Sequence, residues 1–326
     1  MLSVRKLISS AGLAAIIVLP ILAWQNAQAI EDWWRLRDYT PSQEVVALAT
    51  DTKMTDFARR VFYVNHPSLV DDVKSFRESC PQSEQTIVLG CYLSGQNGIT
   101  VYEVKDERLA NAPEVTAAHE MLHAAYDRLS DDERSRVNSL LNDYYKNSLN
   151  NERILDTIDL YKQIEPNDVV NEMHSIFGTE ILSLPTELED YYKRYFTDRS
   201  LVAMLAASYE KEFESRQTQI KDYENQLDDL RARILADERS LRNQLSDLEA
   251  ERNRLDYLKD SGQTEEYNAA VPGFNSMVRS YNSGARDYNA NVKAYNDLLA
   301  AYRRVAGELQ NLYNAIDTRL TTQPAN

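Results

Sequence analysis

Two long heptad repeats in the carboxy-terminal part of the chain are the feature that most constrains its fold. From about residue 206 to residue 258, and again from residue 267 to residue 320, apolar side chains recur every seven positions. This spacing places them on one side of an α-helix, where they need a second apolar surface to cover them. The main seam of the first repeat consists of Phe213, Ile220, Leu227, Ile234, Leu241, Leu248 and Leu255. That of the second repeat consists of Tyr267, Phe274, Tyr281, Tyr288, Tyr295, Tyr302, Leu309 and Ile316.

A short break separates the two repeats. The sequence Asp260-Ser261-Gly262-Gln263 favours a turn between two segments of about 55 residues each. We therefore expect a long antiparallel coiled-coil hairpin over residues 205–326, on the order of 80 Å long at 1.5 Å per residue. Association of two chains through these helices is the alternative. Pro272 lies inside the second repeat, so regular helix is expected only after it.

The composition favours a mostly helical protein and excludes nucleic acid as a partner. Only 9 Gly and 9 Pro occur among 326 residues, of which 43% are hydrophobic, enough for a sizeable core. The net charge of −15 would repel the phosphates of a nucleic acid.

The amino terminus has the pattern of a targeting segment. Arg5 and Lys6 precede an apolar run over residues 7–24, and Ala27-Gln28-Ala29 follows. Residues 1–29 are therefore expected to be a signal peptide or an N-terminal membrane anchor. The length of the run favours an uncleaved anchor that holds the rest of the chain outside the cytoplasm. The alternative is secretion after cleavage near Ala29.

Residues 30–204 are expected to form a mainly α-helical domain with a small β-hairpin. Residues 86–93 and 99–104 are rich in Val, Ile, Tyr and Thr and are separated by a turn sequence, which predicts two strands. Cys80 and Cys91 are the only cysteines. Outside the cytoplasm, so close a pair is expected to form a disulfide.

The motif His119-Glu120-Met121-Leu122-His123 predicts a metal site in this domain. Two of the chain's four histidines lie here, four residues apart, so a helix places both imidazoles on one face. Two such nitrogens suit tetrahedral zinc, and Glu120 is close enough to act as a general base towards a zinc-activated water. Tyr126 shares the histidine face and is expected to be a wall residue of the site, with a second role as a hydrogen-bond donor.

Two segments of this domain resemble the gluzincins, the thermolysin-like branch of the zincin metallopeptidases. The first is His119-Glu120-x-x-His123, followed by Asp127, and the second is Asn171-Glu172-x-x-Ser175. The resemblance covers about 60 residues. It implies that Glu172 is the third zinc ligand and that Asp127 supports the ligands. His174 and Glu180, on the same predicted helix, remain alternatives to Glu172.

The resemblance implies an extracytoplasmic zinc metallopeptidase that hydrolyses peptide bonds with Glu120 as general base. Zincins pair extended substrate with a strand beside the metal, and residues 99–104 are the expected edge strand. The alternative function is a non-enzymatic scaffold of the cell envelope. In that case the hairpin would bind a protein partner or a second copy of the chain.

Overall fold

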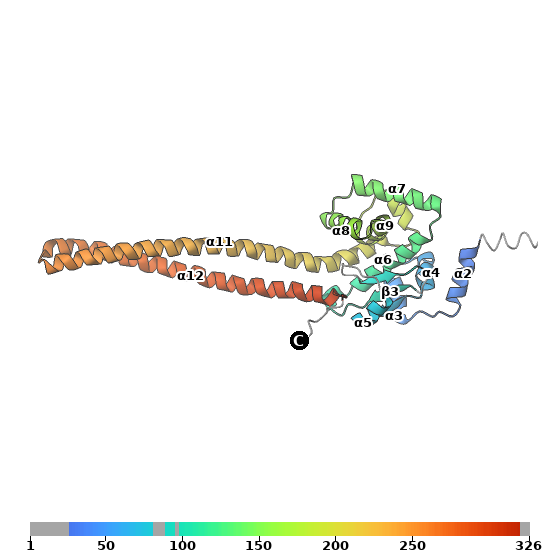
Figure 1. Cartoon of the computed structure of the whole chain (residues 1–326), viewed down its shortest axis with the longest axis horizontal. Coiled ribbons are helices and arrows are strands. Elements are labelled where there is room, and N and C mark those ends of the chain that lie inside the picture. The colour runs from blue at the N-terminus through green and yellow to red at the C-terminus, as the bar shows by residue number, and fades with distance from the viewer. Residues whose placement is uncertain (1–25, 81–88, 95–97, 320–326) are drawn as a thin grey trace, which may run out of the picture. The chain divides into compact units, whose positions relative to one another are not determined.

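The computed structural model describes residues 26–80, 89–94 and 98–319 (Figure 1). They fall into two compact units. The first lies within Met1–Lys211 and Asn314–Asn326, and the second comprises Glu212–Tyr313. The disulfide between Cys80 and Cys91 is present, with the two Sγ atoms 1.98 Å apart.

The expected membrane-anchored localisation has to be corrected. Among the described residues, no helix is both long enough and apolar enough to cross a bilayer. The apolar run at residues 7–24 lies outside the described residues. The first described helix, α2 (Ala27–Leu36), passes through the expected cleavage site near Ala29 and carries the buried, charged Asp32.

The first unit is mainly helical, with a small sheet. Its further elements are α3 (Gln43–Asp51), α4 (Asp56–Val64), β1 (Ser68–Val70), α5 (Val73–Ser79), β2 (Gly90–Tyr92), β3 (Ile99–Tyr102), a 3₁₀ turn (Glu107–Leu109), α6 (Ala112–Asp127), α7 (Asp131–Asn147), α8 (Glu152–Ile164), α9 (Val169–Glu180) and α10 (Thr186–Tyr192). The expectation of a mainly α-helical fold is confirmed.

The sheet differs from the expected hairpin in one respect that bears on function. Its strand order is β1-β3-β2, with β1 parallel and β2 antiparallel to β3. The prediction that residues 99–104 form the edge strand was therefore wrong, because Ser68–Val70 pairs with the other side of β3. Among the described strands, β2 is the edge strand on the side opposite β1.

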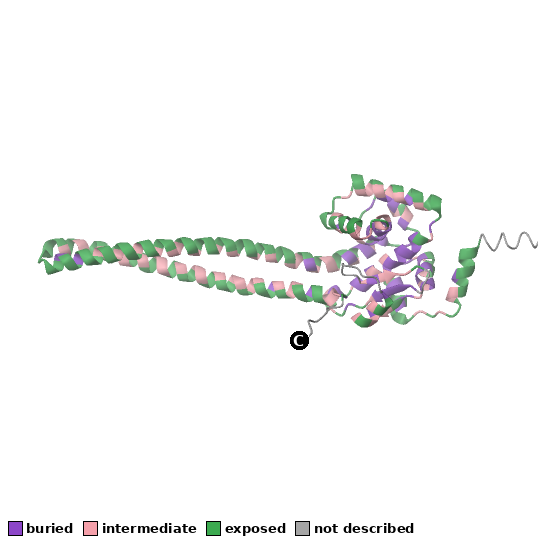
Figure 2. Cartoon of the chain, in the orientation of Figure 1, coloured by how far each residue is buried: buried purple, intermediate pink, exposed green. Residues whose placement is uncertain are grey.

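Helix α6 is the centre of the core (Figure 2). Its residues Ala117, Ala118, Met121, Leu122 and Ala124 have no solvent exposure. The small side chains let neighbouring elements approach closely. At Gly178 of α9, for example, an added Cβ would lie 2.4 Å from Leu122 Cδ1. Both α9 and the sheet therefore pack directly on α6.

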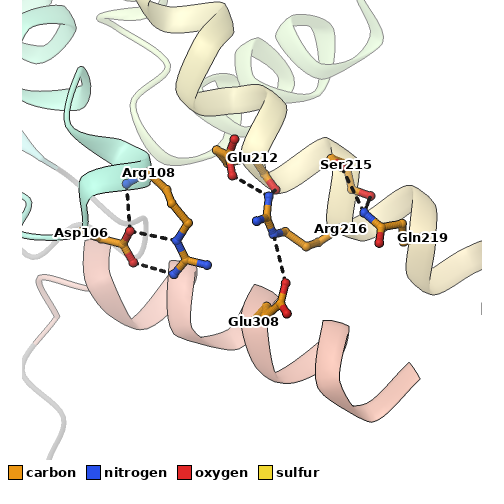
Figure 3. A network of polar contacts seen from close by, with 7 residues as sticks. All are labelled: Asp106, Arg108, Glu212, Ser215, Arg216, Gln219 and Glu308. Carbon is orange, nitrogen blue, oxygen red and sulfur yellow. Dashed lines mark hydrogen bonds and ion pairs between the residues drawn. The ribbon is translucent and has the colours of Figure 1, made fainter. Parts of the chain in front are cut away.

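The second unit is an antiparallel pair of two long helices, α11 (Arg199–Asp260) and α12 (Thr264–Ile316). The first residues of α11 and the last residues of α12 belong to the first unit. The Nε of Arg216 in α11 lies 3.7 Å from the Oε2 of Glu308 in α12, and the Nη1 of Arg216 pairs with Glu212 in the same helix (Figure 3). Nearer the turn, Asn291 Nδ2 donates to Asp237 Oδ2 at 2.8 Å. The expected hairpin is thus present.

Helix α12 also begins earlier than expected. It includes Pro272, which lies in its third turn, so the prediction that regular helix starts only after this proline was wrong. A proline removes one backbone hydrogen bond and its ring crowds the carbonyl four residues earlier, a local cost that the 53-residue helix tolerates.

Candidate metal centre

His119 and His123 lie on the same face of α6, as their spacing predicts. Their Nε2 atoms are 3.0 Å apart, and the two rings meet edge to face. The helix around them is long and buried. His123 is itself only 7% exposed, which restricts the conformations of its side chain.

Glu172 reaches the two histidines from α9. Its Oε1 lies 3.4 Å from His123 Nε2, and its Oε2 lies 3.7 Å from His119 Nε2. Zinc bonds of about 2.0–2.1 Å place the ligand atoms of a tetrahedral site about 3.3 Å apart. The three side chains therefore form a cluster that could hold a metal ion.

The surroundings of Glu172 keep its carboxylate charged. Burial on its own would raise the pKa of Glu172, but attraction to His123 and His119 and a hydrogen bond from Tyr161 outweigh it and lower the pKa. Glu172 Oε2 is nevertheless buried without a hydrogen-bond partner. Such an atom is costly unless a ligand compensates it, and a metal ion at the cluster would do so.

The two alternative third ligands lie elsewhere. His174 is fully buried, and its Nε2 meets the Tyr191 hydroxyl at 2.8 Å. Burial, with lesser repulsion from His123 and His119, lowers the pKa of His174 to about 3. The Oε2 of Glu180 forms an ion pair with the Nη2 of Arg153 at 2.7 Å. The geometry brings only Glu172, among the three candidates, to the histidines.

Glu120 lines the same pocket as the three ligand candidates and is 7% exposed. The backbone of β2 passes directly over it. A Cβ added to Gly90 would lie 2.4 Å from Thr116 Cγ2, 2.9 Å from Glu120 Cγ and 3.1 Å from Glu120 Oε1. A glycine is thus needed for β2 to lie this close to the carboxylate.

Tyr126 does not take the expected position in the site. Its hydroxyl donates to Asn138 Oδ1 at 2.8 Å, and it is not among the residues that line the pocket. Asp127 lies beside Tyr92. Burial raises the pKa of Tyr92, and the Asp127 carboxylate raises it further. Asp127 therefore lies beside a residue that lines the pocket.

Several pocket residues were missed from the sequence. Tyr92 and Tyr161 bring hydroxyl groups to the pocket, and Glu165 and Asp168 bring carboxylates. Burial, followed by the charges of Glu172 and Asp168, raises the pKa of Glu165. Only the tertiary structure brings these residues together, because β2, α8 and the α8–α9 connection are distant from α6 in the sequence.

The pocket is open to solvent and has a volume of about 140 Å³. This volume is smaller than that of a typical small-ligand site, so only the part of a substrate that reaches the metal cluster would enter the pocket.

Comparison with protein-family models, with curated proteins and with solved structures finds no match for this chain. The resemblance to the gluzincins therefore remains a prediction from the two short motifs around His119 and Glu172.

Proposed function

We propose that the chain is a zinc-dependent metallopeptidase with a zincin-like first unit. The observation that carries the proposal is the convergence of His119, His123 and Glu172 in an open pocket that Glu120 also lines. A purely structural site has no need of a second carboxylate at this place.

The donor set fits zinc. Two imidazole nitrogens and one carboxylate oxygen match the ligand sets of catalytic zinc sites, which leave a further position open. The Oε2 of Glu172 lies 3.7 Å from His119 Nε2 but has no hydrogen-bond partner, which supports the presence of a cation. When bound, zinc would supply a Lewis acid that polarises a substrate carbonyl and lowers the pKa of water.

The residues of the chain then have separate roles. Glu120 accepts a proton from the attacking water and returns it to the leaving amine. Tyr92 lines the pocket and is the candidate to stabilise the developing oxyanion, whereas Tyr161 donates its hydrogen bond to Glu172. Strand β2 has an edge that no described strand pairs with, next to the pocket, so extended substrate backbone can pair with it.

The test is hydrolysis of an unstructured protein substrate, such as denatured casein, by the whole chain. We expect activity that a chelator abolishes and stoichiometric zinc restores. Glu120→Gln should lower the rate by about 10²- to 10⁴-fold, because it removes the general base but no zinc ligand. A Glu120→Gln protein as active as the wild type would refute this role of Glu120.

One observation favours a second function. The hairpin of α11 and α12 is far longer than hydrolysis requires, and a scaffold would act through it. If the zinc-loaded chain hydrolyses no peptide bond under any condition, the scaffold becomes the better proposal.

A further inference from the structure

Tyr161 brings a polar group to the metal pocket from a third helix, α8. It lines the pocket together with His119, His123 and Glu172, which come from α6 and α9. Its side chain is half-buried, and its ring packs against the hydrophobic core. A tyrosine in such a place keeps its ring on apolar neighbours and its hydroxyl at a polar one. The hydroxyl of Tyr161 is therefore held close to the proposed zinc ligands.

The polar neighbour of Tyr161 is a proposed metal ligand. Its hydroxyl donates a hydrogen bond to the Glu172 carboxylate. Helix α8 packs on α9, so the donor and the acceptor lie on neighbouring helices of the first unit. A tyrosine hydroxyl has a single proton, and this bond commits that proton to Glu172 rather than to a substrate.

Glu172 needs such a contact because its carboxylate can rotate. The last torsion of a glutamate side chain has broad preferences, so burial of the stem does not fix the direction of the two oxygens. The histidines do not select one orientation strongly. Glu172 Oε1 lies 3.4 Å from His123 Nε2, and Oε2 lies 3.7 Å from His119 Nε2. A donor that approaches from a third helix restricts this rotation.

We propose that Tyr161 is a positioning residue of the metal centre, which holds the Glu172 carboxylate in the orientation that binds zinc. Tyr161 acts through Glu172 and not on the reacting atoms. Outer partners of metal ligands orient the ligand, and their loss commonly weakens metal binding or activity about 10- to 100-fold. This inference rests on the proposed zinc site, but it does not depend on peptide hydrolysis, because it concerns binding alone.

The test is the zinc affinity of the whole chain with Tyr161→Phe, which keeps the ring on the core and removes only the hydroxyl. The affinity is measured by competition with a chromophoric chelator. We expect the variant to bind one zinc per chain with a dissociation constant raised about 10- to 100-fold. With cobalt(II) in place of zinc, the visible absorption spectrum should also differ from that of the wild type, because it reports the geometry of the ligands.

Tyr144→Phe is the matched control. Tyr144 of α7 is also partly buried against the core, and the centre of its ring lies 5.1 Å from that of Phe177 on α9. It is not among the residues that line the pocket. The control therefore loses a hydroxyl near the same helix and should bind zinc and cobalt(II) as the wild type does. An equal loss of zinc affinity in Tyr144→Phe would mean that Tyr161 acts through packing, and would overturn the positioning role.

The outcomes separate this inference from the proposed function. An unchanged zinc dissociation constant in Tyr161→Phe would overturn the inference, and a raised KM in the same variant would show that the hydroxyl contacts substrate instead. A wild type that binds no stoichiometric zinc would refute the metal centre and this inference with it. Weakened zinc binding by Tyr161→Phe, in a chain that hydrolyses nothing, would refute the peptidase and keep Tyr161 as a positioning residue.

Discussion

At the residue scale, the site depends on the absence of a side chain at Gly90, because an added Cβ would collide with Glu120. Gly90 has an ordinary backbone conformation, so its lack of a side chain matters because of the space that a Cβ would need. That space is occupied by Thr116 and by Glu120, the proposed base.

Gly90→Ala is therefore expected to impair hydrolysis more than zinc binding. The new methyl group must displace the Glu120 side chain or β2, and a shift of about 1 Å in a reacting group can cost about 100-fold in rate. The zinc ligands lie on α6 and α9 and do not touch this position, so zinc content should stay at one per chain. The measurements are kcat and metal content.

Gly307→Ala is the matched control, because nothing lies within 4 Å of the Cβ that it adds. Unchanged kcat in Gly90→Ala would mean that β2 does not position Glu120.

At the scale of elements, two kinds of bond hold β2 in place. Its backbone pairs with β3, and Cys91 joins it to Cys80 after the end of α5. The metal ligands, in contrast, lie on two helices that pack directly on each other. We expect β2 to be the part of the site that depends on the disulfide.

Reduction of the disulfide should lower stability by about 3 kcal/mol on the chain-entropy model, since it frees a short loop. It should also lower hydrolysis while zinc is retained. These are the only cysteines, so a mild reductant acts on no other thiol. A protein with both Cys80→Ser and Cys91→Ser should behave in the same way in a denaturant titration. Loss of zinc on reduction would contradict the assignment of the ligands to α6 and α9.

The carboxy-terminal end of α9, the helix whose first turn carries Glu172, is held by a buried arginine. Arg199 is 5% exposed, and it donates to the backbone carbonyls of Phe177, Ile181 and Leu182 and to Glu189. Burial would raise the pKa of Glu189, but Arg199 and the Leu184 N–H outweigh it and lower the pKa.

Glu189→Gln should therefore destabilise the chain by about 3 kcal/mol at neutral pH, because it leaves the Arg199 charge buried without its partner. The contribution of Glu189 is present above its unfolded-state pKa of about 4.5 and is lost as the pH falls below that value. The stability difference between wild type and Glu189→Gln, measured by urea unfolding, should shrink between about pH 5 and pH 3. A difference that does not change with pH would exclude the pair as its cause.

The features that the sequence predicts are those that depend on residues close together along the chain. The histidine helix and the hairpin were predicted because their patterns repeat within a few residues. The position of β3 in the sheet depends on pairing with Ser68–Val70, which has no strong strand pattern. Thr186 and Glu189 fit a capping box, yet Pro185 is the N-cap and Glu189 pairs with Arg199. Glu189 forms an ion pair with the buried Arg199 instead of completing the capping box that the sequence suggests.

At the scale of the whole molecule, the chain consists of two units with separate packing. The helical pair is mostly exposed, with buried residues such as Leu255 and Leu258 near its turn (Figure 2). The metal cluster and its pocket lie entirely in the first unit.

Leu258→Asp should loosen the helical pair without affecting the metal site. A buried charge near the turn should raise the rate of backbone amide hydrogen exchange in the part of the helical pair next to the turn. Zinc content and hydrolysis should stay unchanged. Tyr257→Asp is the control, since Tyr257 is next to Leu258 in the sequence but is 66% exposed. Loss of zinc in Leu258→Asp alone would show that the two units are not independent.

The most direct measurement is the zinc content of the purified chain and of its ligand variants after dialysis against a weak chelator. We predict one zinc per chain in the wild type, and loss of zinc in His123→Ala and Glu172→Gln. Glu180→Gln should keep its zinc, because Glu180 pairs with Arg153 and not with the histidines. A wild type without zinc, or a Glu172→Gln protein that retains it, would contradict the metal centre proposed for this protein.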